Sequence, residues 1–183
     1  LMEFVRTRLP EVILIKPVIC KDSRGFFMET WHSKLFKQAG IDATFVQDNH
    51  SRSVAGTIRG LHYQIKQVQG KLIRVVKGEA FDVAVDLRKP SENFGQWVGE
   101  MLSAENNKQI WIPPGFAHGI LALSETVEIE YKCTDYYAPE HGRTICWNDS
   151  DICIDWPLSE GQQPILSQKD QAGLPLQDAE VYE

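Results

Sequence analysis

The stretch Phe81-Asp-Val-Ala-Val-Asp-Leu87 carries a large apolar residue at every second position, with Asp82 and Asp86 among the residues between them. This alternation has the period of a half-buried β-strand, so the two aspartates are expected on the face away from the core. The stretch Val127-Glu-Ile-Glu-Tyr-Lys-Cys133 alternates in the same way. Its apolar face includes Tyr131, and we therefore expect this tyrosine to point into the protein.

A third stretch, Lys71-Leu-Ile-Arg-Val-Val-Lys77, also reads as a strand, but either of its faces can be the inner one. Lys71 shares a face with Ile73, while the other face, which begins at Leu72, is equally apolar. If Lys71 points inward, its buried charge needs a functional reason.

Strand patterns separated by Gly, Pro and Asn turns cover most of the chain, and the one clear helix pattern spans Ser33 to Gln38. Ser33 is its expected N-cap, and Gly40 lies just past its end. Many strands with little helix predict an all-β fold, an antiparallel jelly-roll barrel. The chain of 183 residues shows no repeat or linker, so residues 1–183 are expected to form one domain. The less regular segment 158–183 is expected to pack over the barrel mouth or exterior, as a candidate lid.

Composition excludes several functional classes. A net charge of −6 argues against a general affinity for nucleic acid or anionic membranes. No apolar run approaches the ~20 residues of a membrane span, and the first residues lack the layout of a signal peptide. G-x-G, P-loop and H-E-x-x-H motifs are absent. The four cysteines form no C-x-x-C pair and are expected to be reduced core thiols, which favours a cytoplasmic protein.

Candidate chemistry begins at Arg59-Gly-Leu-His-Tyr-Gln64. A regular strand would send Arg59 and His62 to opposite faces. A β-bulge at Gly60 would turn both side chains into one cavity, and glycine within a strand often marks such a bulge. The alternative is that His62 is an ordinary core or surface histidine.

Two further motifs carry polar groups. Pro113-Pro-Gly-Phe-Ala-His118 is a tight turn that brings His118 to the start of an apolar run, either at the barrel mouth or as an incidental residue of a hairpin. Ser167-Gln-Lys-Asp170 has the form of a capping box. Asp170 therefore either caps a short helix or, if His62 lies nearby, fixes the tautomer of its ring.

A metal site is a fair alternative, because Pro113-x-Gly115-x-x-His118 fits the second motif of metal-binding cupins. The first motif fails, since His62 is followed by Tyr63 and Gln64 rather than by a second histidine and a glutamate. Two separate imidazoles are too few ligands for a stable metal centre. We therefore predict a cupin-like barrel with no metal.

Together, six segments resemble the dTDP-4-dehydrorhamnose 3,5-epimerase family over about residues 10–171. The segments are Gln47-Asp-Asn-His-Ser51, Arg59-Gly-Leu-His-Tyr-Gln64, Gln69-Gly-Lys71, Trp111-Ile-Pro-Pro-Gly-Phe-Ala-His118, Tyr131-Lys-Cys-Thr-Asp-Tyr-Tyr-Ala-Pro139 and Leu166-Ser-Gln-Lys-Asp170. The resemblance implies a cofactor-free, metal-free cupin homodimer that inverts C3 and C5 of a dTDP-linked 4-keto-6-deoxy sugar. A related mono-epimerase, a ketoisomerase and a non-catalytic sugar-binding cupin are the alternatives.

The resemblance also implies roles for single residues. His62 matches the base that removes a proton next to the ketone, supported by Asp170, and Tyr131 matches the acid on the opposite face. Lys71 would lie beside the enolate oxygen, where a cation stabilises most in a site shielded from water. The positions that match ligand contacts are Arg24, Glu29, Gln47, Asp48, Asn49, Arg59, Lys71, His118, Tyr137 and Lys169.

Three of these positions have further readings. Tyr137 matches the aromatic that stacks on the thymine ring, although a loop aromatic more often packs than stacks. Arg24 and Glu29 could instead be an ordinary surface ion pair. One nearby position departs from the family: Gly142 stands in a stretch that often carries an acidic residue, and glycine has no side chain to contact the nucleotide.

Overall fold

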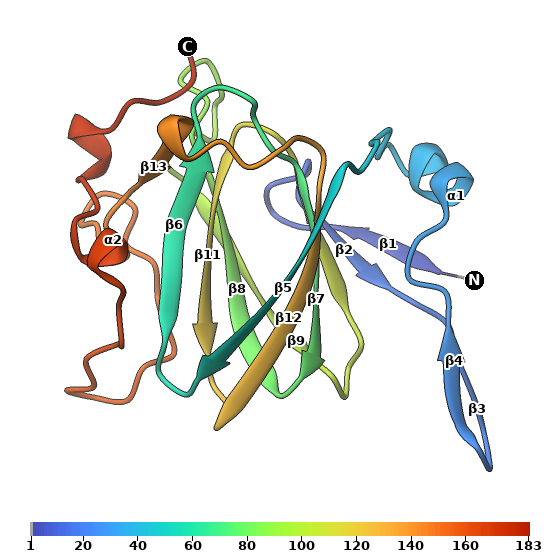
Figure 1. Cartoon of the computed structure of the whole chain (residues 1–183). Coiled ribbons are helices and arrows are strands. Elements are labelled where there is room, and N and C mark those ends of the chain that lie inside the picture. Colours follow the sequence, from blue (N-terminus) through green and yellow to red (C-terminus); the bar gives the residue numbers. More distant parts are fainter. Residues whose placement is uncertain (1) are drawn as a thin grey trace.

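The structure, a computed structural model, describes residues 2–183 and is built from two antiparallel sheets (Figure 1). The six-stranded sheet has the order β1 (Glu3–Arg6), β2 (Ile13–Lys16), β10 (Gln109–Ile112), β7 (Lys71–Lys77), β12 (Thr126–Cys133) and β5 (Gln47–Val54). The five-stranded sheet has the order β13 (Gly142–Thr144), β6 (Ile58–Gln64), β11 (Phe116–Ala122), β8 (Glu79–Asp86) and β9 (Trp97–Ser103). The helical elements are α1 (Ser33–Gln38), α2 (Gln168–Gln171) and the 3-10 turns η1 (Pro139–His141) and η2 (Leu176–Asp178).

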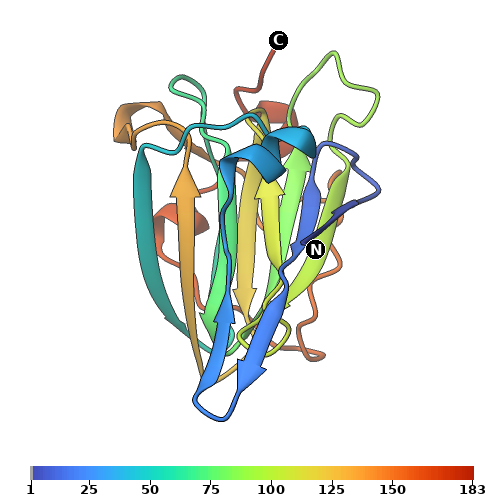
Figure 2. The same ribbon diagram turned by 90° about the vertical axis from the view of Figure 1, so that its right-hand side faces the viewer.

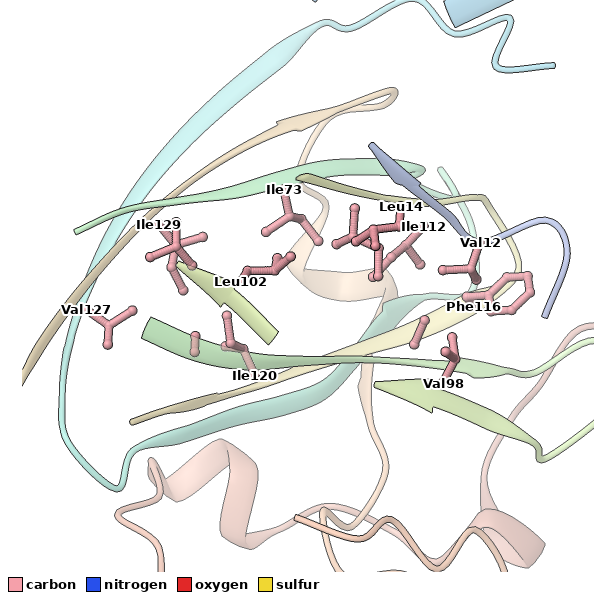
Figure 3. Close-up of a cluster of buried hydrophobic side chains, with 14 of the residues drawn as sticks. Val12, Leu14, Ile73, Val98, Leu102, Ile112, Phe116, Ile120, Val127 and Ile129 are labelled. Atoms are coloured by element: carbon pink, nitrogen blue, oxygen red, sulfur yellow. The ribbon is translucent and has the colours of Figure 1, made fainter. Parts of the chain in front are cut away.

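The main core lies between the two sheets (Figure 3). Ile73 and Ile129 of the six-stranded sheet face Leu102 and Ile120 of the five-stranded sheet, and all four side chains are buried. Because each inner face is apolar, the sheets exclude water by packing against each other. The all-β, cupin-like jelly-roll fold predicted from the sequence is confirmed.

Alternation correctly predicts the inner faces of two strands. On β12, Val127 and Ile129 belong to the core and Tyr131 packs against it, while the residues between them are only partly buried. On β7, Ile73 lies in the same core. Lys71 therefore belongs to the inner face of β7, which resolves the ambiguity in the sequence.

The prediction that β8 is half-buried is wrong. Asp82 and Asp86 are both 0% exposed, because their face of β8 is the one that turns toward the opposite sheet. The other face, with Val83 and Val85, is covered as well, so both faces of this strand are buried. The alternation is real, but it separates two buried environments rather than core from water.

The cover over Val83 and Val85 comes from the end of the chain. Leu166, Leu176 and Val181 pack in the same apolar cluster on the outer face of the five-stranded sheet. Figure 1 shows this segment, in red, outside β6 and β13. It follows that residues 158–183 take part in a second core layer, and α2 within them lies against β6.

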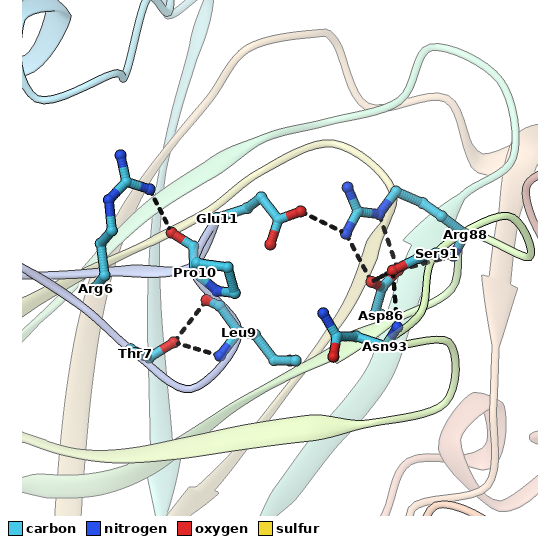
Figure 4. A network of polar contacts seen from close by, with 9 residues as sticks. All are labelled: Arg6, Thr7, Leu9, Pro10, Glu11, Asp86, Arg88, Ser91 and Asn93. Atoms are coloured by element: carbon cyan, nitrogen blue, oxygen red, sulfur yellow. Dashed lines mark hydrogen bonds and ion pairs between the residues drawn. The ribbon is translucent and has the colours of Figure 1, made fainter.

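A polar network ties Asp86 to the loop between β1 and β2 (Figure 4). Arg88 donates to both carboxylate oxygens of Asp86, at 2.9 and 2.6 Å, and also to Glu11 at 3.0 Å. Burial acts to raise the pKa of Asp86, but the hydrogen bonds from Arg88 and Ser91 outweigh it and hold the pKa below its usual value. Asp86 is therefore a paired structural carboxylate.

Helix α1 spans Ser33–Gln38 as predicted, but its N-cap is His32 rather than Ser33, and no side chain caps it. The helix is held by burial of Phe36 in a third apolar cluster with Trp111. Beside it, β3 (Ile19–Asp22) and β4 (Gly25–Met28) form a hairpin that projects from the body (Figures 1 and 2).

All four cysteines are free thiols, but they differ in burial. Cys133 is buried, Cys146 is partly buried, and Cys20 and Cys153 are exposed. The prediction of core thiols is therefore wrong for Cys20 and Cys153, which lie on the hairpin and in a loop.

Candidate active site

A cavity of about 430 Å³ lies between the sheets and is lined by residues of both. Its volume is in the range of small-molecule sites. Ile120 and Ile129 belong to the main core and also form part of the cavity wall. The predicted site residues that line it are Gln47, Asn49, Arg59, His62, Lys71, His118, Tyr131, Tyr137 and Lys169.

The predicted bulge at Gly60 is present and brings Arg59 and His62 into this one cavity. The pairing of β6 with β11 shifts between His62 and Arg59, so two residues of β6, Gly60 and Leu61, lie opposite the single residue Gly119 of β11. Gly60 has φ +142°, and a Cβ there would lie 2.6 Å from the Cα of Gly119. Only glycine fits such a position.

Asp170 lies directly behind His62. Nε2 of the His62 ring is 2.5 Å from Oδ1 of Asp170, which is 3% exposed. Ser167 caps α2 by accepting from the backbone N–H of Asp170, and its hydroxyl donates to Oδ2 at 2.6 Å. The capping residue of α2 is therefore Ser167, and the Asp170 carboxylate is directed to His62 rather than to the helix backbone.

The electrostatics of this pair suit a neutral imidazole on a charged carboxylate. Burial lowers the pKa of His62, and the cations Lys169 and Lys71 lower it further, against the opposing effect of Asp170. Burial acts to raise the pKa of Asp170, but hydrogen bonds from His62, Ser167 and the N–H of Gly60 outweigh it and lower the pKa. Because Nε2–H then donates to Asp170, Nδ1 is the ring nitrogen with the free lone pair.

Tyr131 reaches the cavity from the opposite sheet. It lies on β12, whereas His62 lies on β6, so the two side chains belong to facing walls. Burial raises the pKa of the Tyr131 hydroxyl, and its neighbours Cys133 and Tyr137 add to this effect. The phenol therefore keeps its proton at neutral pH and can donate it.

Lys71 lines the cavity from β7, the neighbour of β12. Burial lowers the pKa of its ammonium group, and Lys169 lowers it further, whereas Cys133 and Asp82 act to raise it. A desolvated cation of this kind favours an anion beside it, because its charge is poorly screened by water.

A second histidine that lines the cavity, His118, is also paired with an aspartate. Nε2 of His118 is 2.9 Å from Oδ2 of Asp82, and His118 pairs across the ladder with His62. Asp82 is missed by sequence reasoning, which places it on a solvent face. The one available signal is that Asp82 interrupts the apolar centre of its strand, where an acidic residue is unusual.

The outer part of the cavity carries two more cations. Arg59 is held by its Nε on the hydroxyl of Ser53 at 2.8 Å and by Nη2 on the carbonyl of Arg52 at 3.0 Å. Lys169 enters from α2 and lies next to Gly142. These groups supply local positive charge in a chain whose net charge is −6.

The sequence profile of the dTDP-4-dehydrorhamnose 3,5-epimerase family matches residues 6–178. The chain belongs to this family. It is 56% identical to a dTDP-4-dehydrorhamnose 3,5-epimerase of Pseudomonas aeruginosa, over 99% of each chain, and 49% identical to that of Escherichia coli, over 93% and 92%. A crystal structure of a 3,5-epimerase from Legionella pneumophila, in complex with dTDP-4-keto-L-rhamnose, superimposes with a TM-score of 0.95 at 50% identity, covering 98% of this chain and 95% of the other.

Three predicted ligand positions of this epimerase lie outside its cavity. Arg24 is on the β3–β4 hairpin and pairs with Asp22 at 2.7 Å, so the alternative of an ion pair with Glu29 is wrong. Glu29 follows the same hairpin. Asp48 points to the outer face of β5, where it pairs with Lys132 at 2.9 Å.

Gly142 lines the epimerase cavity with a backbone that any residue can adopt, at φ −66° and ψ 135°. A Cβ there would lie 3.2 Å from the carbonyl oxygen of Pro139 and 3.5 Å from Nζ of Lys169. The glycine is therefore not required by the backbone. Its effect is to leave space beside the ammonium of Lys169.

The described residues of the epimerase hold neither a cluster of metal ligands nor a helix that could span a membrane. Among residues 2–183, no three or more His, Cys, Asp or Glu side chains are grouped to hold a metal ion. None of the helices in that part of the chain is long and apolar enough to cross a bilayer.

Proposed function

We propose that this epimerase inverts C3 and C5 of a dTDP-linked 4-keto-6-deoxyhexose through an enolate, converting dTDP-4-dehydro-6-deoxyglucose to dTDP-4-dehydrorhamnose. The observation that carries the proposal is the placement of His62, backed by Asp170, and Tyr131 on facing walls of one cavity. Inversion needs a base on one face of the sugar ring and an acid on the other. Each positioned proton transfer contributes about 10²–10⁴ in rate.

In the first step, Nδ1 of His62 takes the proton from the carbon next to the C4 ketone. The electron pair of the broken C–H bond forms the carbon–carbon double bond of the enolate, and the negative charge moves to the C4 oxygen. The ammonium of Lys71 stabilises that charge in a desolvated site. Asp170 stabilises the imidazolium that His62 becomes.

In the second step, the Tyr131 hydroxyl returns a proton to the same carbon from the opposite face, which restores the ketone with inverted configuration. The raised pKa of Tyr131 keeps this proton available. Exchange with solvent then returns a proton to Tyr131 and removes one from His62. The sequence repeats at the second carbon, on the other side of the ketone.

The nucleotide part of the substrate is proposed to occupy the outer cavity. Arg59 and Lys169 are suited to the diphosphate because they are the cations there. Tyr137 lines the cavity and is 58% exposed, and it is proposed to stack on the thymine. His118 and Asn49 line the inner part and are proposed to hydrogen-bond the sugar.

We also infer a homodimer. Phe26 and Phe27 on the projecting hairpin are 60% and 73% exposed, an apolar surface that a second copy would cover. Arg24 and Glu29 are on or next to this hairpin and do not line their own cavity. Their predicted contact with the nucleotide sugar is therefore proposed to occur in the cavity of the partner.

The protein is further proposed to act in the cytoplasm without a cofactor or metal. Free thiols at all four cysteines suit a reducing compartment. The proposed proton transfers use only side chains of this chain.

The test is incubation with dTDP-4-keto-6-deoxyglucose in heavy water, followed by proton NMR. Deuterium at both C3 and C5 with inversion at both is expected. Deuterium at one carbon alone indicates a mono-epimerase, and its absence from both indicates a binding protein. A His62→Asn variant should stay folded and bind dTDP but lose turnover; exchange at the wild-type rate in that variant would overturn the proposed base.

A further inference from the structure

Three glutamines hold one short loop at the mouth of the cavity. Nε2 of Gln69 donates to the carbonyl of Asp135 at 2.8 Å, and Nε2 of Gln64 donates to the carbonyl of Tyr136 at 3.1 Å. Oε1 of Gln47 accepts from the N–H of Tyr137 at 2.9 Å, and Oε1 of Gln64 accepts from the N–H of Ala138 at 2.8 Å. Four consecutive residues, 135–138, are thus each fixed by a side-chain amide.

We propose that Gln64 is a positioning residue that sets the ring of Tyr137 for nucleotide binding, an inference that rests on the proposed function. Its carboxamide bonds the residues on both sides of Tyr137 and so brackets it. Tyr137 itself is 58% exposed and has no aromatic partner among the described residues. The backbone on either side therefore sets where the side chain of Tyr137 leaves the loop, and with it the directions open to its ring.

The side chain of Gln64 is buried and fully hydrogen-bonded, which suits a positioning role. It is 5% exposed, and Nε2 also donates to the carbonyl of Gln67 at 2.7 Å, so both ends of its amide are satisfied. The backbone carbonyl of Gln64 accepts from the hydroxyl of Tyr182 at 2.7 Å, which fixes the end of β6. Gln64 lies two residues after His62 on the same strand face. One strand thus carries the proposed base and the anchor of the stacking loop.

The main experiment compares Gln64→Leu with a matched control, Asn106→Leu, in the intact protein. Asn106 also makes three hydrogen bonds with its amide, to Ser103, Lys108 and Met101, but in a turn outside the cavity. The Gln64 variant should bind dTDP about tenfold more weakly by calorimetry. Its KM should rise more than its kcat falls. Asn106→Leu should leave dTDP affinity unchanged, and equal losses in both variants would overturn the proposal.

A second variant, Gln64→Glu, keeps the shape and covers the case in which Gln64→Leu does not fold. The carboxylate accepts from Ala138 as before but faces the carbonyls of Tyr136 and Gln67 without a proton to donate. Protonation restores one donor. The affinity of this variant for dTDP, relative to wild type, should therefore rise as the pH is lowered. If the ratio of the two dTDP affinities does not change with pH, the proposed role of Gln64 in positioning Tyr137 is contradicted.

Two further measurements separate this inference from the proposed stacking. Hydrogen exchange of the Tyr137 and Ala138 amides in the ligand-free protein should be faster in Gln64→Leu, whatever the ligand is. In a Tyr137→Ala background, Gln64→Leu should cost no further dTDP affinity, because it acts through that ring. If Tyr137→Ala alone leaves dTDP affinity unchanged, the proposed stacking of Tyr137 on the nucleotide is wrong. If hydrogen exchange at these amides is unaltered in Gln64→Leu, the proposed positioning role of Gln64 is wrong.

Discussion

Replacing Asp170 by asparagine removes a negative charge from behind His62 while keeping the shape of the side chain. In the wild-type site, Oδ1 accepts from His62 Nε2 and Oδ2 accepts from the Ser167 hydroxyl. An asparagine can keep its oxygen toward His62 and turn its amide toward Ser167, whose hydroxyl also accepts. The cap of α2 uses the backbone N–H of residue 170 and is unaffected. We therefore expect Asp170→Asn to fold and to bind dTDP normally.

The expected loss is in kcat, because the imidazolium that forms when His62 takes the proton loses its counter-charge. A hydrogen bond to a charged group contributes about 1.5–3 kcal/mol. Lost from the transition state, this corresponds to roughly a 10- to 150-fold decrease in kcat. The effect should be milder than that of His62→Asn, which removes the base itself.

The pH dependence of the rate gives a second test of this role. A base works unprotonated, so the rate falls as the pH drops through the pKa of His62. Burial lowers that pKa from 6.5, which puts the acid limb of the free wild-type enzyme below pH 6.5. Asp170 acts to raise the pKa of His62, so Asp170→Asn should move the limb to still lower pH.

The assay is kcat and kcat/KM followed by NMR across the acid range, with Ser167→Ala as the control. That control removes both hydrogen bonds between the Ser167 hydroxyl and Asp170, including the cap of α2, but keeps the charge of Asp170. Its kcat should fall less than that of Asp170→Asn. An unchanged kcat in Asp170→Asn, or an acid limb that moves to higher pH, would refute the proposed role of the carboxylate.

Three other outcomes are expected. Tyr131→Phe should still exchange substrate protons with heavy water through His62 but fail to accumulate inverted sugar; inversion at the wild-type rate by NMR would make Tyr131 a core residue only. The purified enzyme should hold no stoichiometric transition metal by elemental analysis and stay active in chelator, whereas one metal per chain with activity lost on its removal would contradict this. Mixing inactive His62→Asn and Arg24→Ala subunits should restore about a quarter of wild-type activity, because half of a random mixture is heterodimer with one intact site of two. No recovery would place Arg24 in its own subunit's cavity, and an Arg24→Ala homodimer of wild-type activity would place it outside the site.

Much of the site follows from alternation and glycine chemistry. The inward placement of Tyr131 follows from the pattern of β12, and the bulge at Gly60 explains how Arg59 and His62 share a cavity. The orientation of Lys71 could be assigned only from the structure, because both faces of β7 are apolar and each belongs to a different cluster.

The sequence could not show that both faces of β8 are covered by other parts of the chain. Alternation places Asp82 in solvent only if one face of β8 is uncovered. The C-terminal segment covers the Val83 face, but its apolar residues, such as Leu166 and Val181, have no regular spacing that would predict this packing. Gln64 was missed for a related reason. Two hydrogen-bond partners of this buried glutamine, the carbonyl of Tyr136 and the N–H of Ala138, lie 72 and 74 residues away in the sequence, and only the bond to Gln67 is local. The pairing therefore exists only in the folded chain.

The sandwich itself explains why its chemistry can act on both faces of a sugar ring. His118 follows the turn into β11 and Ile120 lies two residues further in, while Ile129 lies two residues before Tyr131 on β12. Both isoleucines belong to the main core as well as to the cavity wall. The separation between the histidine wall and the tyrosine wall is thus set by the same packing that holds the sheets together. Because closely packed cores resist compression, that spacing is fixed before the ligand enters. The choice between one inversion and two then depends on how far the ring can tilt between walls that do not move.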